Sequence, residues 1–342
     1  MFIASASDMF EPMWDSYSNR GWTRNITMSF RDEFHRSKFG FQDTCRERFL
    51  TFHWRAPGII YVFYRLALAS YTLTILILDI SHSEKSKNFS LIWLAYLTEW
   101  TYIMLTVYFC YHALVTLAVY NSCQGVKLKL MRNMDFSEHK YLFRELYVMS
   151  NGYQQANVTD DDPMDIVDRS SDPENNQVNQ GSAADDPMDI VEPSDTIPWY
   201  LCLVWILFNT AGVFALVVSL GFWTLLARLM DASFLVSEQN LQIHLINSFL
   251  VLLELSVTAI PVRLMHAVYP LAYGIIYAIF ALVYWSVDHN NVVYPVLDFG
   301  KSPGIAVACI LVIGFVVVPL LQLLLYGFYR LKLRLFQQCC WN

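Results

Sequence analysis

The sequence predicts an all-α integral membrane protein, a bundle of six transmembrane helices with both termini in the cytoplasm. Hydrophobic residues make up 55% of the 342 residues and charged residues only 15%, whereas a soluble domain carries roughly 25% charged residues on its solvated surface. The apolar residues are gathered into runs of the roughly 20 residues that cross a bilayer. Lysine and arginine are scarce in every second connection between these runs.

Six runs are long enough to span the membrane. They cover residues 59–80, 91–120, 197–227, 241–262, 267–287 and 305–328. The second and third are longer than a bilayer requires, so we expect them to tilt or to extend past the headgroups. The N-terminus lacks a basic region followed by an apolar core, so we expect no cleaved signal peptide and insertion through the first run.

The orientation follows from the positive residues. Eighteen Lys and Arg residues lie before the first run, between the second and third, between the fourth and fifth, and after the sixth, whereas the other three connections hold four. Positive residues collect on the cytoplasmic side of membrane proteins. The chain therefore divides into a cytoplasmic N-terminal segment, two helices, a cytoplasmic loop, four helices and a cytoplasmic tail, at residues 1–56, 57–121, 122–196, 197–328 and 329–342.

The long cytoplasmic loop contains an internal repeat. The sequence Asp-Asp-Pro-Met-Asp-Ile-Val occurs at residues 161–167 and again at residues 185–191, among Asn, Gln, Ser, Gly and Asp. This composition cannot bury enough apolar surface to offset the entropy of ordering. The repeat is thus interpreted as a duplicated disordered linker or, more specifically, as a linear motif for a cytoplasmic partner between residues 161 and 191.

No pattern in the sequence indicates a cofactor or a metal ion. There is no HExxH, no paired cysteine motif and no glycine-rich phosphate loop, and the eight histidines are scattered. The net charge of −7 owes much to the acidic loop and says little about the fold. We expect membrane lipids as partners and no nucleic acid.

Two ionisable residues of opposite charge lie at the same predicted depth. Arg65 is about six residues into the first run and Glu254 about eight residues from the cytoplasmic end of the fourth, roughly 9–12 Å above the inner boundary. A charge inside a bilayer is costly unless it is paired. We therefore predict a structural ion pair, and prefer it to a transport role because a lone pair makes a poor pathway.

A second polar set collects near the outer side. Thr98 and Glu99 lie near the outer end of the second run, and His244 and Asn247 near that of the fourth. His244, Asn247 and Glu254 follow three- and four-residue steps, so they share one helix face, which must point into the bundle.

This arrangement allows Thr98 and His244 to meet. A threonine hydroxyl beside an imidazole can act as a nucleophile activated by a general base. The alternative is a threonine bonded to its own backbone and a packed histidine.

Several blocks resemble the rolling stone family of multipass membrane proteins. They are Tyr64-Arg65, residues 91–100 (LIWLAYLTEW), residues 244–254 (HLINSFLVLLE), residues 258–263 (TAIPVR), residues 277–285 (YAIFALVYW) and residues 293–298 (VYPVLD). The resemblance covers roughly residues 55–121 and 197–335, and the acidic repeat has no counterpart in it. It implies a role in cell fusion and myogenesis.

The chain is similar, more distantly, to the androgen-induced family of membrane hydrolases, which cleave fatty acid esters of hydroxy fatty acids. Their threonine and histidine match Thr98 and His244, and their Val-Tyr-Pro element matches the one that contains Tyr294. The resemblance implies Thr98 as the nucleophile and His244 as base and then acid. Asn247 would donate to the oxyanion, a role suggested by its position one turn along, and Tyr294 and Asp298 would line the entrance.

Two functions remain open at this stage. The first is a rolling stone type protein that acts in cell fusion, although its short outer loops offer little surface for adhesion. The second is an intramembrane lipid esterase, and one protein can combine both roles. A transporter is less favoured because no inverted hydropathy repeat is visible. The protein is expected in the plasma membrane or the endoplasmic reticulum.

Overall fold

The computed structural model describes residues 33–42, 44, 46–54, 56–85, 93–133, 197–227, 231, 235–290 and 292–340. The repeat between residues 161 and 191 lies outside these ranges. The chain divides into two units, residues 1–119 with 194–342 and residues 120–193. The first unit holds the helix bundle.

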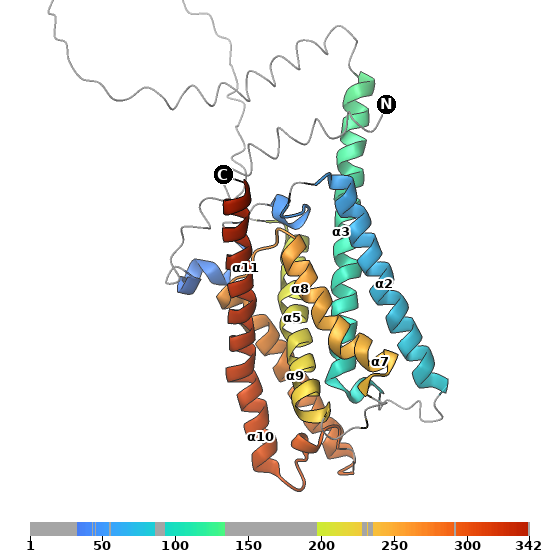
Figure 1. Cartoon of the computed structure of the whole chain (residues 1–342), viewed down its shortest axis with the longest axis vertical. Coiled ribbons are helices and arrows are strands. Elements are labelled where there is room, and N and C mark those ends of the chain that lie inside the picture. Colours follow the sequence, from blue (N-terminus) through green and yellow to red (C-terminus); the bar gives the residue numbers. More distant parts are fainter. Residues whose placement is uncertain are drawn as a thin grey trace, which may run out of the picture. The chain divides into compact units, whose positions relative to one another are not determined.

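The bundle is built from these helices (Figure 1). Their bounds are α2 Gly58–Lys85, α3 Leu97–Asn133, α5 Trp199–Gly221, α7 Glu238–Leu241, α8 Asn247–Val257, α9 Val268–Val287, α10 Pro303–Val312 and α11 Val318–Cys340. Single π-helical turns at Phe222–Leu226, Gln242–Ile246 and Ile313–Val317 follow α5, join α7 to α8 and join α10 to α11. Short 3-10 turns lie at Arg36–Phe39, Arg46–Phe49, Trp93–Ala95, Leu264–Ala267 and Pro295–Leu297.

The all-α fold with six membrane-spanning helices is confirmed. Within the described residues, six helical stretches are long and apolar enough to cross a membrane. They are Gly58–His82, Leu97–Ser122, Trp199–Leu225, Glu238–Val257, Leu264–Val287 and Pro303–Phe336. The orientation stays a prediction, so we call the end of the bundle where α2 begins the predicted inner end, and the opposite end the predicted outer end.

Three helix ends differ from those expected. The fourth span ends at Val257 rather than at residue 262, and Thr258 has an extended backbone. Pro261 cannot continue a helix and disfavours helical geometry in the residue before it. At the predicted inner end, α3 continues to Asn133 and α11 to Cys340, because a helix need not stop where its sequence becomes polar.

Helix α5 forms the centre of the bundle. In the apolar 18-residue stretch of its span 72% of the residues are buried, compared with 11% in that of the span that contains α10 and α11. Small residues allow this close packing, as is common in membranes. A Cβ atom added to Gly212 would lie 3.5 Å from Leu325 of α11 and 3.5 Å from Val251 of α8. The helices on either side of α5 are therefore held close to it.

The C-terminal end of α8 is capped by positive side chains. The Lys332 ammonium donates to the carbonyl oxygens of Leu255 and Thr258 at 2.6 and 2.7 Å. The Arg48 guanidinium donates to the carbonyl of Ala259 at 3.2 Å. The last carbonyls of a helix have no partner within it and carry its negative pole. These cations supply both a donor and a compensating charge.

The described part of the N-terminal segment packs onto the same end of α8. The backbone N–H of His53 donates to the carbonyl of Val257, and the indole of Trp54 donates to the carbonyl of Ser256. Arg263, just beyond α8, donates in turn to the carbonyl oxygens of Gly40 and Gln42. This segment therefore closes the predicted inner end of the bundle.

Candidate functional site

Arg65 and Glu254 lie against each other in the interior of the bundle. Nη1 of Arg65 is 2.6 Å from Oε1 of Glu254, and the two side chains are 0% and 1% exposed. Arg65 belongs to α2 and Glu254 to α8. The sequence placed them at equal depth, and the structure also gives them facing positions.

Aromatic hydroxyls and a histidine complete this group. Tyr64 and Tyr108 donate to the Glu254 carboxylate at 2.9 and 2.5 Å, and Arg65 donates to Tyr61. His112 lies 2.6 Å from the carbonyl oxygen of Phe49 and 3.3 Å from the Tyr108 hydroxyl. We call this set the Arg65 cluster; its members are Tyr61, Tyr64, Arg65, Tyr108, His112 and Glu254. Nearly all of its polar atoms have partners, and the exception among these described side chains is Nε of Arg65.

Thr98 begins the stripe of α3 that faces the interior. Counting by three and four residues from Thr98 leads to Tyr102, Leu105, Phe109 and His112, each at most 2% exposed. Positions at this spacing share one helix face. Thr98 is itself half-buried at the N-terminal turn of this face.

Tyr294, from the loop between α9 and α10, lies beside the hydroxyl of Thr98. Its own hydroxyl accepts the backbone N–H of Leu97 at 3.0 Å. Tyr277 lies next to Tyr294 and donates to the carbonyl of Ala95 at 2.8 Å. Burial raises the pKa of Tyr294 above its ordinary value. Tyr294 therefore lies over the start of α3 as a neutral phenol.

His244 lies in the π-helical turn that joins α7 to α8. Its ring stacks on Phe222, with ring centroids 3.7 Å apart and an interplanar angle of 6°. Phe222 begins the π-helical turn after α5, so two such turns meet at this contact. Single π-turns within helices occur frequently at functional sites. The Nδ1 atom of His244 is buried and has no hydrogen-bond partner among the described residues.

Asn247 is one turn further along the same helix. It is 0% exposed, and both its amide nitrogen and its amide oxygen lack partners in the part of the chain that the structure describes. Asn247 is two turns before Glu254, whose carboxylate contacts α2 and α3, so the Asn247 side chain faces the same interface. An unpartnered buried amide costs free energy. A ligand or water that bonds to it would recover that cost.

Counting residues along α3 and along the helix of Glu254 gives Thr98 and His244 a similar height in the bundle. The contact between Tyr108 and Glu254 joins α3 to α8, which run in the same direction. Thr98 precedes Tyr108 by ten residues, and His244 precedes Glu254 by ten residues. Each is therefore roughly 15 Å above that contact. In the described residues no hydrogen bond joins Thr98 to Nδ1 of His244, since that nitrogen has no partner.

Asp298 organises its own loop. Its carboxylate accepts the backbone N–H groups of Gly300 and Lys301 at 3.0 and 2.9 Å, and it lies 3.8 Å from the Lys301 ammonium. This turn positions the loop that contains Tyr294. The geometry thus gives Asp298 a local structural task, and its place at an entrance stays a prediction.

A second acidic residue was not predicted from the sequence. Asp79, near the end of α2, accepts a hydrogen bond from the indole of Trp93 at 2.9 Å and another from the amide of Gln239. Its carboxyl also lies close to that of Glu99, the residue after Thr98. The position of Asp79 could have indicated this contact, because an aspartate near the end of an apolar run needs a partner.

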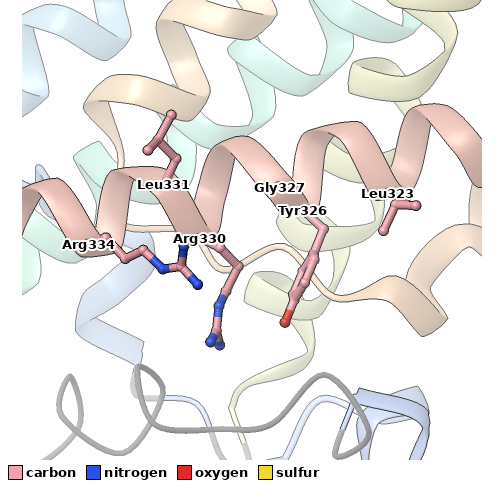
Figure 2. Close-up of a pocket in the computed structure, with 6 residues that line it drawn as sticks. All are labelled: Leu323, Tyr326, Gly327, Arg330, Leu331 and Arg334. Atoms are coloured by element: carbon pink, nitrogen blue, oxygen red, sulfur yellow. The ribbon is translucent and has the colours of Figure 1, made fainter.

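The described residues contain no group of three or more His, Cys, Asp or Glu side chains that could hold a metal ion. The groove shown in Figure 2 lies elsewhere, along α11, with a volume of about 410 Å³. Tyr326, Arg330 and Arg334 project from one side of this helix. None of the candidate residues lines the groove. The candidate site is therefore defined by buried polar groups and not by this groove.

Similarity to known proteins covers the C-terminal part of the chain. The family model described as protein rolling stone matches residues 194–341. Protein rolling stone of Drosophila melanogaster is 29% identical over 137 residues, which are 39% of this chain and 49% of the fly protein. The chain thus spans about half the length of this curated relative. No solved structure matches the chain. The family match includes His244, Asn247 and Tyr294 but not Arg65 or Thr98.

Proposed function

We propose that this chain, whose residues 194–341 match the rolling stone family, is an intramembrane hydrolase of lipid esters. One observation carries the proposal. A buried histidine nitrogen and a buried amide, in His244 and Asn247, have no partner within the described part of the protein, at the level of a threonine hydroxyl on a facing helix. Such groups are expected where a polar part of a ligand completes the hydrogen bonds.

The reaction would proceed in two steps. The hydroxyl oxygen of Thr98 attacks the ester carbonyl carbon, and Nδ1 of His244 takes its proton. The same proton then passes to the departing alcohol, which leaves an acyl group on Thr98. Water attacks the acyl group, His244 takes a proton from the water, and the carboxylic acid leaves as Thr98 regains its hydrogen. The amide of Asn247 donates to the negative oxygen of each tetrahedral intermediate.

Tyr294 supports this reaction by fixing the Thr98 hydroxyl. A hydroxyl that is already oriented loses less entropy when it reacts. In the reaction the Thr98 hydroxyl would turn from Tyr294 toward His244. Asn247 is the oxyanion donor, and Asp298 is expected to act only through the position of the loop.

The test is labelling of the full-length protein in membranes with a fluorophosphonate probe. The wild type is expected to be labelled. Thr98→Ala should lose the labelling because it removes the nucleophile. His244→Ala should lose it because it removes the base, and base catalysis contributes roughly 10²–10⁴-fold. Thr101→Ala is the matched control for the threonine. Thr101 is one turn away, is buried, and donates to the carbonyl of Leu97 at 2.8 Å.

His289→Ala is the control for the histidine, since His289 is an exposed residue that packs on Trp285. Both control variants are expected to label like the wild type. Absence of labelling in a wild type that is folded and inserted would rule out the hydrolase. Equal labelling of Thr98→Ala would rule out this nucleophile.

A role in cell fusion is the second candidate, favoured by the family match over residues 194–341. It requires the plasma membrane, whereas a lipid hydrolase can also act in the endoplasmic reticulum. Cells that express the chain with one of two fluorescent markers would be mixed and scored for double-positive cells. Fusion that persists in Thr98→Ala would separate the two functions, and fusion that is lost in this variant would unite them.

A further inference from the structure

Two buried carboxyl groups lie close to each other near the predicted outer end of the bundle. Asp79 belongs to α2 and Glu99 to α3, and they are only 5% and 8% exposed. Two carboxyl groups so close together in a dry environment rarely both ionise, and a pair that shares one proton carries one negative charge.

The donors that surround this pair leave part of it unsatisfied. Trp93 and Gln239 donate to the two oxygens of Asp79. Oε2 of Glu99 is buried and has no partner among the described groups. None of the ion pairs within the described residues includes Asp79 or Glu99. A buried negative charge without a compensating cation is expensive, so the described part of the protein leaves this charge uncompensated.

Aromatic side chains lie beside the pair. The Trp93 indole donates to Asp79 at 2.9 Å, and Tyr71 and Tyr102 lie near the same carboxylate. Tyr102 is 2% exposed, and its hydroxyl has no hydrogen-bond partner within the described residues. It is three residues after Glu99 on α3, so it lies on the adjoining part of the same face.

We propose that the Asp79–Glu99 cluster, formed by Asp79, Glu99, Trp93, Tyr71 and Tyr102, binds an organic ammonium group of a membrane lipid or amphiphile. Aromatic faces together with carboxylates are the chemistry that recognises alkylated ammonium ions. A single net negative charge matches a monovalent cation. The described residues offer no third carboxylate, histidine or cysteine there, as a metal ion would require.

A ligand can reach the cluster from the edge of the bundle. Tyr71 is 36% exposed, and its hydroxyl bonds to Gln242 at 2.5 Å. Gln239, which donates to Asp79, is also exposed. An amphiphile with its chain in the lipid can therefore direct its ammonium head between α2 and α7. The inference goes beyond the proposed hydrolase, because binding needs no nucleophile.

The test uses the full-length protein in neutral maltoside micelles with decyltrimethylammonium as the probe. Tryptophan fluorescence and the shift of the unfolding temperature report binding. The wild type is expected to bind this probe at least about tenfold more tightly than decyl sulfate. The double variant Asp79→Asn/Glu99→Gln is expected to lose this preference, because it removes the charge and keeps the size of both side chains.

Two further variants keep the result interpretable. Glu99→Gln can donate a hydrogen bond to Asp79, so this single variant should fold even if the double variant does not. It should weaken binding of the probe several-fold. Glu238→Gln removes an exposed carboxylate at the start of α7 and should bind like the wild type. Thr98→Ala should also bind normally, which separates this inference from the hydrolase. Equal affinity for the two probes, or full binding by Glu99→Gln and the double variant, would overturn the proposal.

Discussion

The Arg65 cluster and the polar groups at the level of His244 differ in how completely their hydrogen bonds are satisfied. In the former, Glu254 accepts from Arg65, Tyr64 and Tyr108. In the latter, Nδ1 of His244 and the whole amide of Asn247 have no partner among the residues that the structure describes. Glu254 and Asn247 lie on one face of α8, and His244 lies in the π-helical turn that precedes it. A satisfied buried network stabilises a fold, whereas unsatisfied buried groups point to a ligand.

The largest effect should come from breaking the Arg65 cluster. Glu254→Gln leaves the buried Arg65 guanidinium without a counter-charge, which should lower the free energy of unfolding by about 3–5 kcal/mol. Thermal unfolding in detergent measures the loss. Glu238→Gln, at an exposed position, is the control and should change stability little. If Glu254→Gln were no less stable than this control, the cluster would not be a structural centre.

A substitution of Asn247 is expected to change the free energy of unfolding in the opposite direction. Asn247→Leu removes an unpartnered amide from the interior, so it should stabilise the protein by about 1–3 kcal/mol and abolish fluorophosphonate labelling. The matched control is Asn209→Leu on α5. Asn209 is also buried, but it donates to the carbonyl of Trp205 and accepts from Gln322, so its loss should destabilise. Destabilisation by both variants would mean that Asn247 has a structural partner.

The smallest effect is expected at Tyr294, which joins the loop to the start of α3. Tyr294→Phe removes the bond to Leu97 and the polar contact with Thr98, at a cost of about 1 kcal/mol at neutral pH, and should slow labelling. Burial raises the pKa of Tyr294 in the folded protein, so above about pH 10 the unfolded chain loses the phenol proton first. The wild type should therefore lose stability as the pH rises from about 9 to about 11, and its advantage over Tyr294→Phe should shrink.

Tyr284→Phe is the control for this comparison, because Tyr284 is a partly exposed residue of α9. Its stability should follow the wild type across the same pH range. A constant difference between the wild type and Tyr294→Phe would contradict the buried phenol. Unfolding temperatures at half-unit steps of pH provide the measurement.

Part of the candidate site could be predicted from the sequence. Counting residues along two apolar runs assigned equal depth to Arg65 and Glu254, and the structure brings their charged atoms to 2.6 Å. The same count gave Thr98 and His244 equal depth, but no contact between them follows from it. The three tyrosines and His112 of the Arg65 cluster were missed, because an aromatic residue in a membrane helix is ordinarily packing material or an interface anchor.

Other elements depended on neighbours distant in the sequence. The sequence identified the N-terminal segment only as cytoplasmic, and the structure shows that its described part donates to the carbonyls at the end of α8. Asp79 was overlooked, and its partner Gln239 lies 160 residues away. Pro261 in the sequence explains why the helix of the fourth span ends early, at Val257. The extended backbone after Val257 also depends on Arg48 and Lys332, which donate to its carbonyl oxygens.

The sequence by itself determined that this protein is a bundle of six membrane helices and the depth of each polar residue within it. Both follow from local quantities, the length of an apolar run and the fixed rise per residue of a helix. Only the tertiary structure decided which faces meet and which polar groups are satisfied, and it left Asn247 and His244 without partners among the described residues. The length and depth of an apolar run do not determine how a helix is rotated about its axis. That rotation is set by the packing of side chains from all the neighbouring helices.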